Sequence, residues 1–208
     1  MYELIQVAAH TWYIDCPAKM GVVQVNGDGV FLIDSGNDKE AGKKVQKLLD
    51  QNGWRLLAIL NTHSNADHIG GNKLLQERTG CSIYAPGMEA AFTRWPCLEP
   101  SFLYGGYPPK ALRNKFLMAQ PSGVQDLSEL PLPAGMEILP LPGHFFDMVG
   151  VKTPDGVWFL ADWRNTTSTL FTTWGPTWRP WTRWSGWRAP ASFPHTRLRR
   201  RTSRRWRP

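Results

Sequence analysis

The stretch that decides the fold is Thr62-His63-Ser64-Asn65-Ala66-Asp67-His68-Ile69-Gly70-Gly71-Asn72. Two histidines, one aspartate and one asparagine fall within six residues, directly after the apolar run at 56–60. Polar side chains are costly to bury at the edge of a core unless they are partnered. Histidine nitrogen and carboxylate oxygen are suitable zinc ligands, and a loop at the end of a strand can aim several of them at one point. The stretch therefore predicts a metal site.

Two later segments have the same character. Leu141-Pro142-Gly143-His144 places a histidine after the apolar run at 137–141, and Phe159-Leu160-Ala161-Asp162 places an acid at the end of another. If these strand ends meet at one edge, they bring together His63, Asp67, His68, His144 and Asp162. This is a candidate metal-binding constellation.

In this order along the chain, the segments resemble the metallo-β-lactamase-fold hydrolases. That family's signature is His-x-His-x-Asp-His, followed by a Pro-Gly-His turn and by an aspartate after a hydrophobic strand. Asp34, within Leu32-Ile33-Asp34-Ser35-Gly36, also resembles the family's early Asp-x-Gly turn. The resemblance covers roughly residues 10–162 and implies an α/β fold, a metallo-β-lactamase-like αββα sandwich.

The resemblance also implies roles for individual residues. His63 and His144 would bind one metal ion, Asp67 and His68 would bind a second, and Asp162 would bridge the two. The implied cofactor is zinc, as one or two ions, with iron or manganese as alternatives. A metal-activated water would attack an ester, thioester, lactone or phosphoester of a small-molecule substrate. The catalytic role falls to Asp67, which would orient the nucleophile and carry a proton.

One position departs from the family signature. Asn65 stands where the family usually has histidine, and an amide oxygen binds zinc more weakly than an imidazole does. Asn65 is therefore either a weak metal ligand or a hydrogen-bonding partner of a bound water. A catalytically impaired metal-binding remnant is the alternative to an active hydrolase.

The secondary structure expected around these motifs is a mixed sheet covered by helices. The turns Asn26-Gly27-Asp28-Gly29 and Thr153-Pro154-Asp155-Gly156 indicate hairpins. The expected strands are 21–25, 30–34, 56–60, 81–85, 137–141, 149–152 and 157–160, and the expected helices are 38–51 and one ending near 78, with a loop at 61–71. Residues 86–136, rich in proline, glycine and aromatics, are either a lid over the site or a surface excursion packed on itself.

The charge divides the chain into two parts. Its 208 residues carry a net charge of +7, but residues 1–162 hold 13 Lys+Arg against 17 Asp+Glu. Residues 163–208 hold 11 Arg, no Lys and no acid, together with seven of the 11 Trp. We therefore expect a metallo-β-lactamase-like domain at 1–162 and a separate Arg/Trp/Pro-rich tail at 163–208. The sandwich is then incomplete at its C-terminus.

The tail lacks the helix and the final histidine that the family has near its C-terminus. Tryptophan has the single codon TGG. If the coding DNA is read in a frame shifted by two bases, the last base of the preceding codon joins the TG of each tryptophan codon, and the resulting codon encodes Leu, Met or Val. The shifted reading of 173–184 repeats apolar residues at helical spacing, and the shifted reading of 191–196 is compatible with the missing histidine motif. We hypothesise that the tail is out-of-frame or disordered. The alternatives are nucleic-acid binding through Arg and Trp, and a substitute ligand at His195.

Composition excludes several classes. Hydrophobic residues make up 42% of the chain, which excludes wholesale disorder. No apolar run has the length of about 20 residues that a membrane span requires. Three widely spaced cysteines make no disulfide framework, and the first residues do not resemble a secretory signal. We expect a cytoplasmic protein with a small-molecule substrate and no membrane or nucleic-acid partner.

Overall fold

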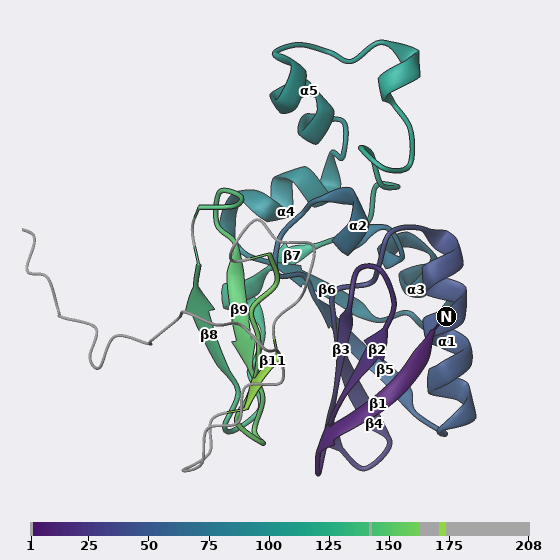
Figure 1. Ribbon diagram of the computed structural model, residues 1–208, viewed down its shortest axis with the longest axis vertical. Helices are drawn as coiled ribbons and strands as arrows, with labels where there is room; N and C mark the ends of the chain where they lie inside the picture. The colour runs from purple at the N-terminus through teal and green to yellow at the C-terminus, as the bar shows by residue number, and fades with distance from the viewer. Residues whose placement is uncertain (1, 142, 163–170, 174–208) are drawn as a thin grey trace, which may run out of the picture. The chain divides into compact units, whose positions relative to one another are not determined.

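The protein contains two β-sheets with helices around them (Figure 1). The structure, a computed structural model, describes residues 2–141, 143–162 and 171–173. The predictions for the tail at 163–208, including the frame hypothesis and His195, therefore lie outside the described residues, apart from the backbone of 171–173. None of the helices in the described part is long and apolar enough to cross a membrane.

The first sheet has seven strands in sequence order. They are β1 (Glu3–Ala8), β2 (Thr11–Asp15), β3 (Met20–Asn26), β4 (Gly29–Ile33), β5 (Arg55–Leu60), β6 (Ser82–Ala85) and β7 (Gln125–Asp126). The first four pair antiparallel, whereas β4 to β7 pair parallel. The expected hairpin, the buried strand after it and the strand at 81–85 are confirmed. Strands β1 and β2 were not expected.

Helix α1 (Lys39–Gln51) connects β4 to β5, as its apolar spacing predicts. Its N-terminus is capped by Asp38, whose Oδ1 accepts hydrogen bonds from the backbone N–H groups of Glu40 and Ala41, both at 3.0 Å. Ala41, Val45 and Leu49 form the buried stripe.

The second sheet has four strands in the order β11-β10-β9-β8, all antiparallel. They are β8 (Glu137–Pro140), β9 (Val149–Lys152), β10 (Val157–Phe159) and β11 (Phe171–Thr173). The expected strand at 137–141 and the late hairpin are confirmed. A side-chain contact ties this hairpin to the first sheet, because Asp155 Oδ2 accepts hydrogen bonds from the His10 N–H at 2.7 Å and the Thr11 hydroxyl at 2.8 Å.

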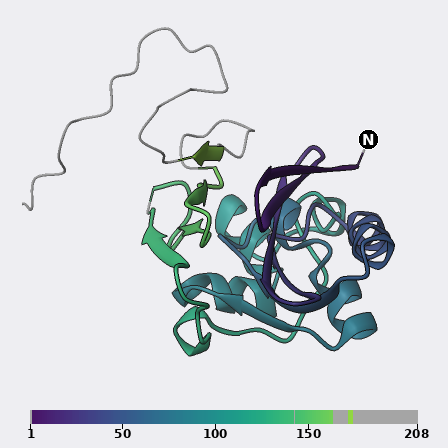
Figure 2. The same ribbon diagram turned by 90° about the horizontal axis from the view of Figure 1, so that it is seen from below.

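Two apolar cores separate three layers. One core joins α1 and α3 (Asn72–Thr79) to the first sheet, with Val45, Leu75 and Leu32 among its buried residues. The other joins the facing sides of the two sheets, where Phe31 and Phe159 belong to one cluster. Figure 2 shows the helices, the first sheet and the second sheet from below. The α/β class with two packed sheets is thus confirmed.

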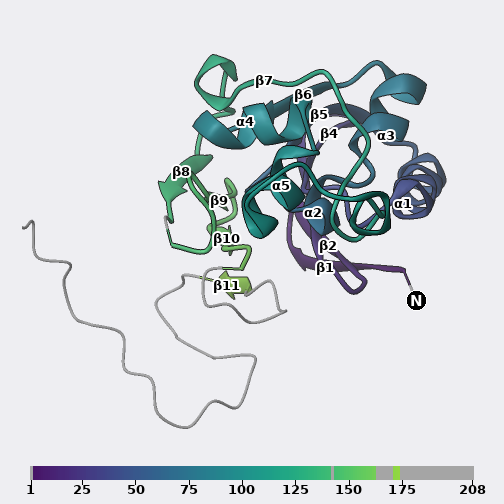
Figure 3. The same ribbon diagram turned by 90° about the horizontal axis from the view of Figure 1, so that it is seen from above.

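The connections carry the remaining elements. They are α2 (Ala66–Ile69), α4 (Gly87–Arg94), α5 (Leu98–Tyr104) and the 3-10 turns η1 (Lys110–Leu112) and η2 (Leu127–Glu129). The expectation of a loop throughout 61–71 is wrong, because α2 forms within it. The segment at 86–136 is partly helical, as expected, and its helix α5 lies above α2 in Figure 1 and in front of α2 in Figure 3.

Candidate metal centre

The motif begins where β5 ends, between the two sheets. The Asn61 N–H donates to the Tyr84 carbonyl at 2.8 Å, which continues the pairing with β6, and the Thr62 carbonyl accepts from the Val149 N–H of β9 at 2.9 Å. The chain therefore passes from the first sheet to the second at this point. This explains why a motif after β5 can meet residues that precede and follow β9 and β10.

All six candidate ligands lie in this region. One possible ligand atom from each of His63, His144 and Asp162 lies within 4.8 Å of the other two. Nε2 of His68 lies 3.6 Å from Asp162 Oδ2 and 3.8 Å from Asp67 Oδ2. Nε2 of His144 lies 3.7 Å from Asp162 Oδ2. Asp162 therefore stands between His68 and His144.

His63 is the candidate ligand whose surroundings most favour binding a metal. Its Nδ1 lies 3.1 Å from the Thr62 hydroxyl, whereas its Nε2 is buried and makes no hydrogen bond with any residue that the structure describes. Burial holds the pKa of His63 well below its usual value, and the neighbouring His68 and His144 lower this pKa further. The ring is thus neutral, which is the form that binds a metal. A buried nitrogen without a partner needs a ligand to offset its desolvation.

His68 is oriented by Asp34. Nδ1 of His68 lies 2.8 Å from Asp34 Oδ2, and the same carboxylate accepts hydrogen bonds from the Thr62 N–H at 2.8 Å and hydroxyl at 2.7 Å. Burial alone would lower the pKa of His68, but Asp34 and Asp162 outweigh it and hold this pKa well above its usual value. Asp34 thus leaves Nε2 of His68 facing Asp162, as an outer-shell carboxylate does in metal sites.

The turn that carries Asp34 also holds α2 in place. Asp34 adopts a left-handed conformation with φ of 61°, and the next residue, Ser35, donates its N–H to the His68 carbonyl at 2.8 Å. A Cβ at Gly70 would lie 2.3 Å from the Asn37 carbonyl carbon, and a Cβ at Gly71 would lie 2.4 Å from the Ser35 carbonyl oxygen. The two glycines therefore permit this close approach.

Asp162 follows β10 and is half-buried. The preceding residue, Ala161, has φ of 48°, so the chain turns sharply there. Burial raises the pKa of Asp162, but His68 and His144 outweigh it and hold this pKa below its usual value. Asp162 is therefore an anion between two imidazoles.

Asn65 contributes an oxygen to the same space. Its Oδ1 lies 3.1 Å from His144 Nε2, and its Nδ2 donates to Glu99 Oε1 at 2.8 Å. The ring of His144 in turn lies 5.1 Å from that of His63, centroid to centroid. The residue at the position that departs from the family signature is thus within the cluster.

Two buried glutamates that the sequence analysis did not identify hold the motif from the segment at 86–136. Glu99 accepts from the Asn65 side chain and from the Ala66 N–H at 3.0 Å. Glu89 accepts from the Ser64 N–H at 2.9 Å, from the Ser64 hydroxyl and from the Asp147 N–H at 2.9 Å. Burial raises the pKa of Glu89, and it raises the pKa of Glu99 to about 7. The only feature of the sequence that could have indicated these two glutamates is the presence of acidic residues in an aromatic-rich segment.

An aromatic cluster lies next to His144. It joins α4 and α5 to the two residues after that histidine, and its members are Phe92, Phe102, Phe145 and Phe146. Ring centroids are 5.0 Å apart for Phe92 and Phe145, and 5.0 Å apart for Phe102 and Phe146. Phe92 is buried, whereas Phe102 is 57% exposed. The cluster therefore reaches from the core to solvent.

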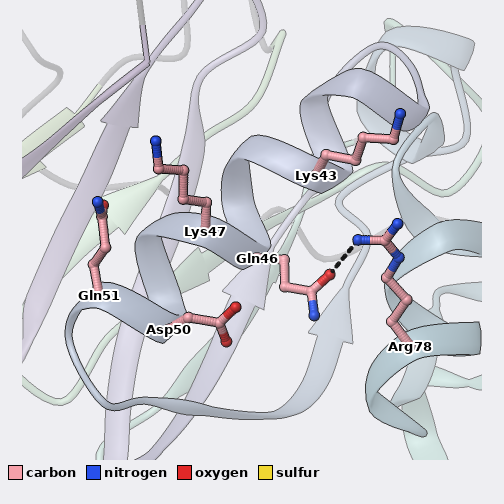
Figure 4. A pocket seen from close by; sticks show the side chains of 6 residues that line it. All are labelled: Lys43, Gln46, Lys47, Asp50, Gln51 and Arg78. Atoms are coloured by element: carbon pink, nitrogen blue, oxygen red, sulfur yellow. Dashed lines mark hydrogen bonds between the residues drawn. The ribbon is translucent and has the colours of Figure 1, made fainter.

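A separate polar hollow lies along α1 and α3 (Figure 4). It is lined by Lys43, Gln46, Lys47, Asp50, Gln51 and Arg78. Arg78 donates to Gln46 at 3.0 Å across it. This hollow contains none of the candidate ligands.

The donor set fits a divalent metal. Imidazole nitrogens with carboxylate and amide oxygens suit zinc, iron and manganese. A metal would in turn give the buried Nε2 of His63 the partner that it lacks among the described residues. The residues present are therefore consistent with the metal that the family resemblance implies.

Known proteins resemble this chain in sequence and in fold. Solved relatives in fold include MEM-A1, a subclass B3 metallo-beta-lactamase from a soil metagenome library, with 23% identity, 75% of this chain and 57% of that chain covered and a TM-score of 0.57. "Probable metallo-hydrolase YybB" of Bacillus subtilis is 29% identical over 143 residues, 67% of this chain and 56% of that protein. A hydroxyacylglutathione hydrolase of Methylococcus capsulatus is 46% identical over 46 residues, 22% of this chain and 18% of that protein.

The chain thus spans only part of the length of these curated relatives. The sequence model described as "Metallo-beta-lactamase superfamily" matches residues 13–162, which is well over half of the chain and includes every candidate ligand. The chain belongs to the metallo-beta-lactamase superfamily of hydrolases.

Proposed function

We propose that this protein is a metal-dependent hydrolase that acts on a small-molecule ester, thioester, lactone or phosphoester. The observation that carries the proposal is the buried, unpartnered Nε2 of His63 beside His144 and Asp162. The proposed metal-binding residues are His63, Asn65, Asp67, His68, His144 and Asp162. A divalent metal bound there would supply a water of lowered pKa and would polarise the oxygen of the scissile group.

The chain's own residues have distinct tasks in this proposal. His63 is neutral by burial and offers a nitrogen lone pair, while Asp34 fixes the ring of His68. Asp67 is the residue we assign to proton transfer, because its carboxylate is 53% exposed and lies 3.8 Å from His68 Nε2. It can therefore accept a proton from the attacking water and release it to solvent or to the leaving group.

The surroundings favour a substrate with an apolar acyl group. The aromatic cluster begins at Phe145, directly after His144, and extends to the half-exposed Phe102. An apolar group that packs on this surface would have its carbonyl next to His144. The hydroxyacylglutathione hydrolase that is similar to 46 residues of this chain is named for an acylglutathione substrate, which agrees with a carbonyl substrate. We therefore place esters and thioesters before phosphoesters.

The alternative function, a catalytically impaired metal-binding remnant, rests on Asn65. This residue stands where the family signature has a histidine, and its amide oxygen binds zinc more weakly than an imidazole does. It predicts that metal binds but that no substrate is turned over. A third possibility, nucleic-acid binding through the tail, predicts salt-sensitive binding that is lost when residues 163–208 are deleted.

The test is zinc content and zinc affinity of the purified chain, followed by hydrolysis of p-nitrophenyl esters and acyl thioesters. We expect about one or two zinc ions per chain, and loss of both binding and turnover in His63→Ala and His68→Ala. His10→Ala is the matched control, since His10 is exposed at the β1–β2 turn and pairs with Gln24. A folded wild-type chain that binds no zinc would refute the proposal, and zinc without turnover would favour the remnant.

A further inference from the structure

We propose that Glu99 is a positioning residue that turns the side-chain oxygen of Asn65 toward the metal site. In this view the Asn65–Glu99 pair supplies the ligand that an imidazole supplies in the family signature. The inference rests on the metal-binding function proposed above, and it concerns which atom of Asn65 the metal meets. It assigns a function to a residue of α5 that lies outside every motif of the family signature.

The side chain of Asn65 has two chemically different ends. An amide nitrogen is a donor with no lone pair to offer a metal, whereas an amide oxygen can bind one. Here Nδ2 donates to Glu99 Oε1 at 2.8 Å, and Oδ1 lies 3.1 Å from His144 Nε2. Asn65 is the residue before α2, but its side chain does not cap that helix. Glu99 is therefore the contact that fixes which end faces the site.

A carboxylate at position 99 permits only this orientation. An ionised carboxylate accepts hydrogen bonds and donates none. One oxygen of Glu99 accepts from the Ala66 N–H at 3.0 Å, and the other meets the amide of Asn65. Glu99 is only 6% exposed, so water offers little competition. If Asn65 were reversed, its oxygen would face a buried carboxylate oxygen, which is a repulsive contact.

Replacing this carboxylate with an amide reverses the prediction. In Glu99→Gln the new side chain has one acceptor and one donor end. The Ala66 N–H is a fixed backbone donor, so the glutamine oxygen must face it and the glutamine nitrogen must face Asn65. Asn65 then has to turn over to accept that hydrogen bond, and its own nitrogen points to the metal site. A nearly isosteric change thus removes one metal ligand without enlarging the cavity.

A second change restores the ligand. In Asn65→Asp/Glu99→Gln the introduced aspartate accepts from the glutamine nitrogen with one oxygen and offers the other to the metal. Asn65→Asp alone places two carboxylates against each other in a buried site. Asn65→Asp should therefore be unfavourable when position 99 is glutamate, and it should restore the metal ligand when Glu99→Gln is also present. A merely structural role for Glu99 would not produce this reversal.

Glu89 provides the matched control. It is fully buried, lies on the neighbouring helix α4, and holds the adjacent residue Ser64 through the backbone N–H and the hydroxyl. In the part of the chain that the structure describes, its carboxylate accepts hydrogen bonds from Ser64 and Asp147 and from none of the candidate ligands. Glu89→Gln therefore also removes a buried carboxylate that holds the motif, but it does not reverse a ligand.

The experiment measures Zn²⁺ affinity at pH 8 by competition with a chromophoric chelator, beside the unfolding free energy of each metal-free variant. We expect Glu99→Gln to weaken Zn²⁺ binding about 10- to 100-fold, Asn65→Asp/Glu99→Gln to restore it, and Glu89→Gln to change stability more than affinity. Wild-type affinity in Glu99→Gln, an equal loss in Glu89→Gln, or no recovery in the double variant would overturn the inference. A wild-type chain that binds no Zn²⁺ would instead overturn the proposed function, and this inference with it.

Discussion

Oδ2 of Asp34 lies 2.8 Å from Nδ1 of His68, and both side chains are buried. The contact joins the turn after β4 to the helix that carries the second half of the motif. Because Nδ1 is occupied, Nε2 is the nitrogen left to face Asp162 and Asp67. In the proposed metal site, this early aspartate would therefore act through a histidine, and not as a ligand itself.

Asp34→Asn is expected to weaken zinc affinity about 10- to 100-fold. The carboxylate accepts from the Thr62 N–H, the Thr62 hydroxyl and His68, whereas an amide has one acceptor oxygen and would place a donor against one of these groups. Zinc titration against a chelator measures the effect. Asp28→Asn is the control, since Asp28 is an exposed aspartate whose Oδ2 lies 3.9 Å from Arg55 Nε. Equal affinities in the two variants would show that Asp34 does not orient His68.

The stability of the metal-free protein should depend on pH through Glu99. Burial raises the pKa of Glu99 from 4.5 to about 7 in the folded state, so the folded protein binds this proton more tightly than the unfolded chain does. This group therefore lowers the unfolding free energy as pH rises from about 4.5 to 7, by at most about 3 kcal/mol. Chemical denaturation at pH 5 and pH 8 should show a smaller loss in Glu99→Gln than in the wild type. Parallel pH profiles would contradict the prediction.

Gly70→Ala should lower the unfolding free energy by about 1–3 kcal/mol, the usual range for overpacking. Gly70 has an ordinary helical backbone, with φ of −63° and ψ of −27°, so the cost comes from space alone. Its new Cβ would lie 2.3 Å from the backbone of Asn37, which cannot move without displacing the start of α1. Gly106→Ala, where no atom lies within 4 Å, should leave stability nearly unchanged. Thermal denaturation compares the two, and equal midpoints would argue against this packing.

Phe102→Ala should raise KM for an ester with a long acyl chain about three- to tenfold and leave KM for the acetyl ester unchanged. The expected size corresponds to about 1 kcal/mol of lost apolar contact. Phe116→Ala is the control, because Phe116 is 69% exposed and is not a member of the aromatic cluster. Steady-state kinetics on both esters checks the prediction. The same change in both KM values, or an equal effect of Phe116→Ala, would exclude the cluster as the acyl-binding surface.

Local patterns predicted much of the fold. The Asn26-Gly27-Asp28-Gly29 turn lies between β3 and β4, and the apolar spacing of Ala41, Val45 and Leu49 corresponds to the buried stripe of α1. Strands β1 and β2 were missed because neither has a tight turn signal or strict alternation, and they gain stability by pairing with β3. Helix α2 was missed because four residues are too short for a periodic pattern.

The partners of the motif residues could not be predicted in the same way. Glu89 lies 25 residues from Ser64, and Glu99 lies 34 residues from Asn65. Nothing in the local sequence of either glutamate distinguishes it from an acidic residue at the surface. The two readings of residues 86–136 were a lid and a self-packed excursion. The structure shows that this segment contacts the motif through two buried carboxylates, which neither local reading specified.

The sequence by itself determined the types and the order of the chemical groups. Imidazoles and carboxylates are costly to bury at the ends of strands unless they are partnered, and a bound metal is one such partner. It also determined the strands and helices whose apolar period is local. Only the tertiary structure decided that Nε2 of His63 is left without a partner, that Asp34 orients His68, and that Glu99 orients Asn65. These depend on contacts between residues far apart in the chain, and such contacts exist only after the two sheets and the segment above them have packed together.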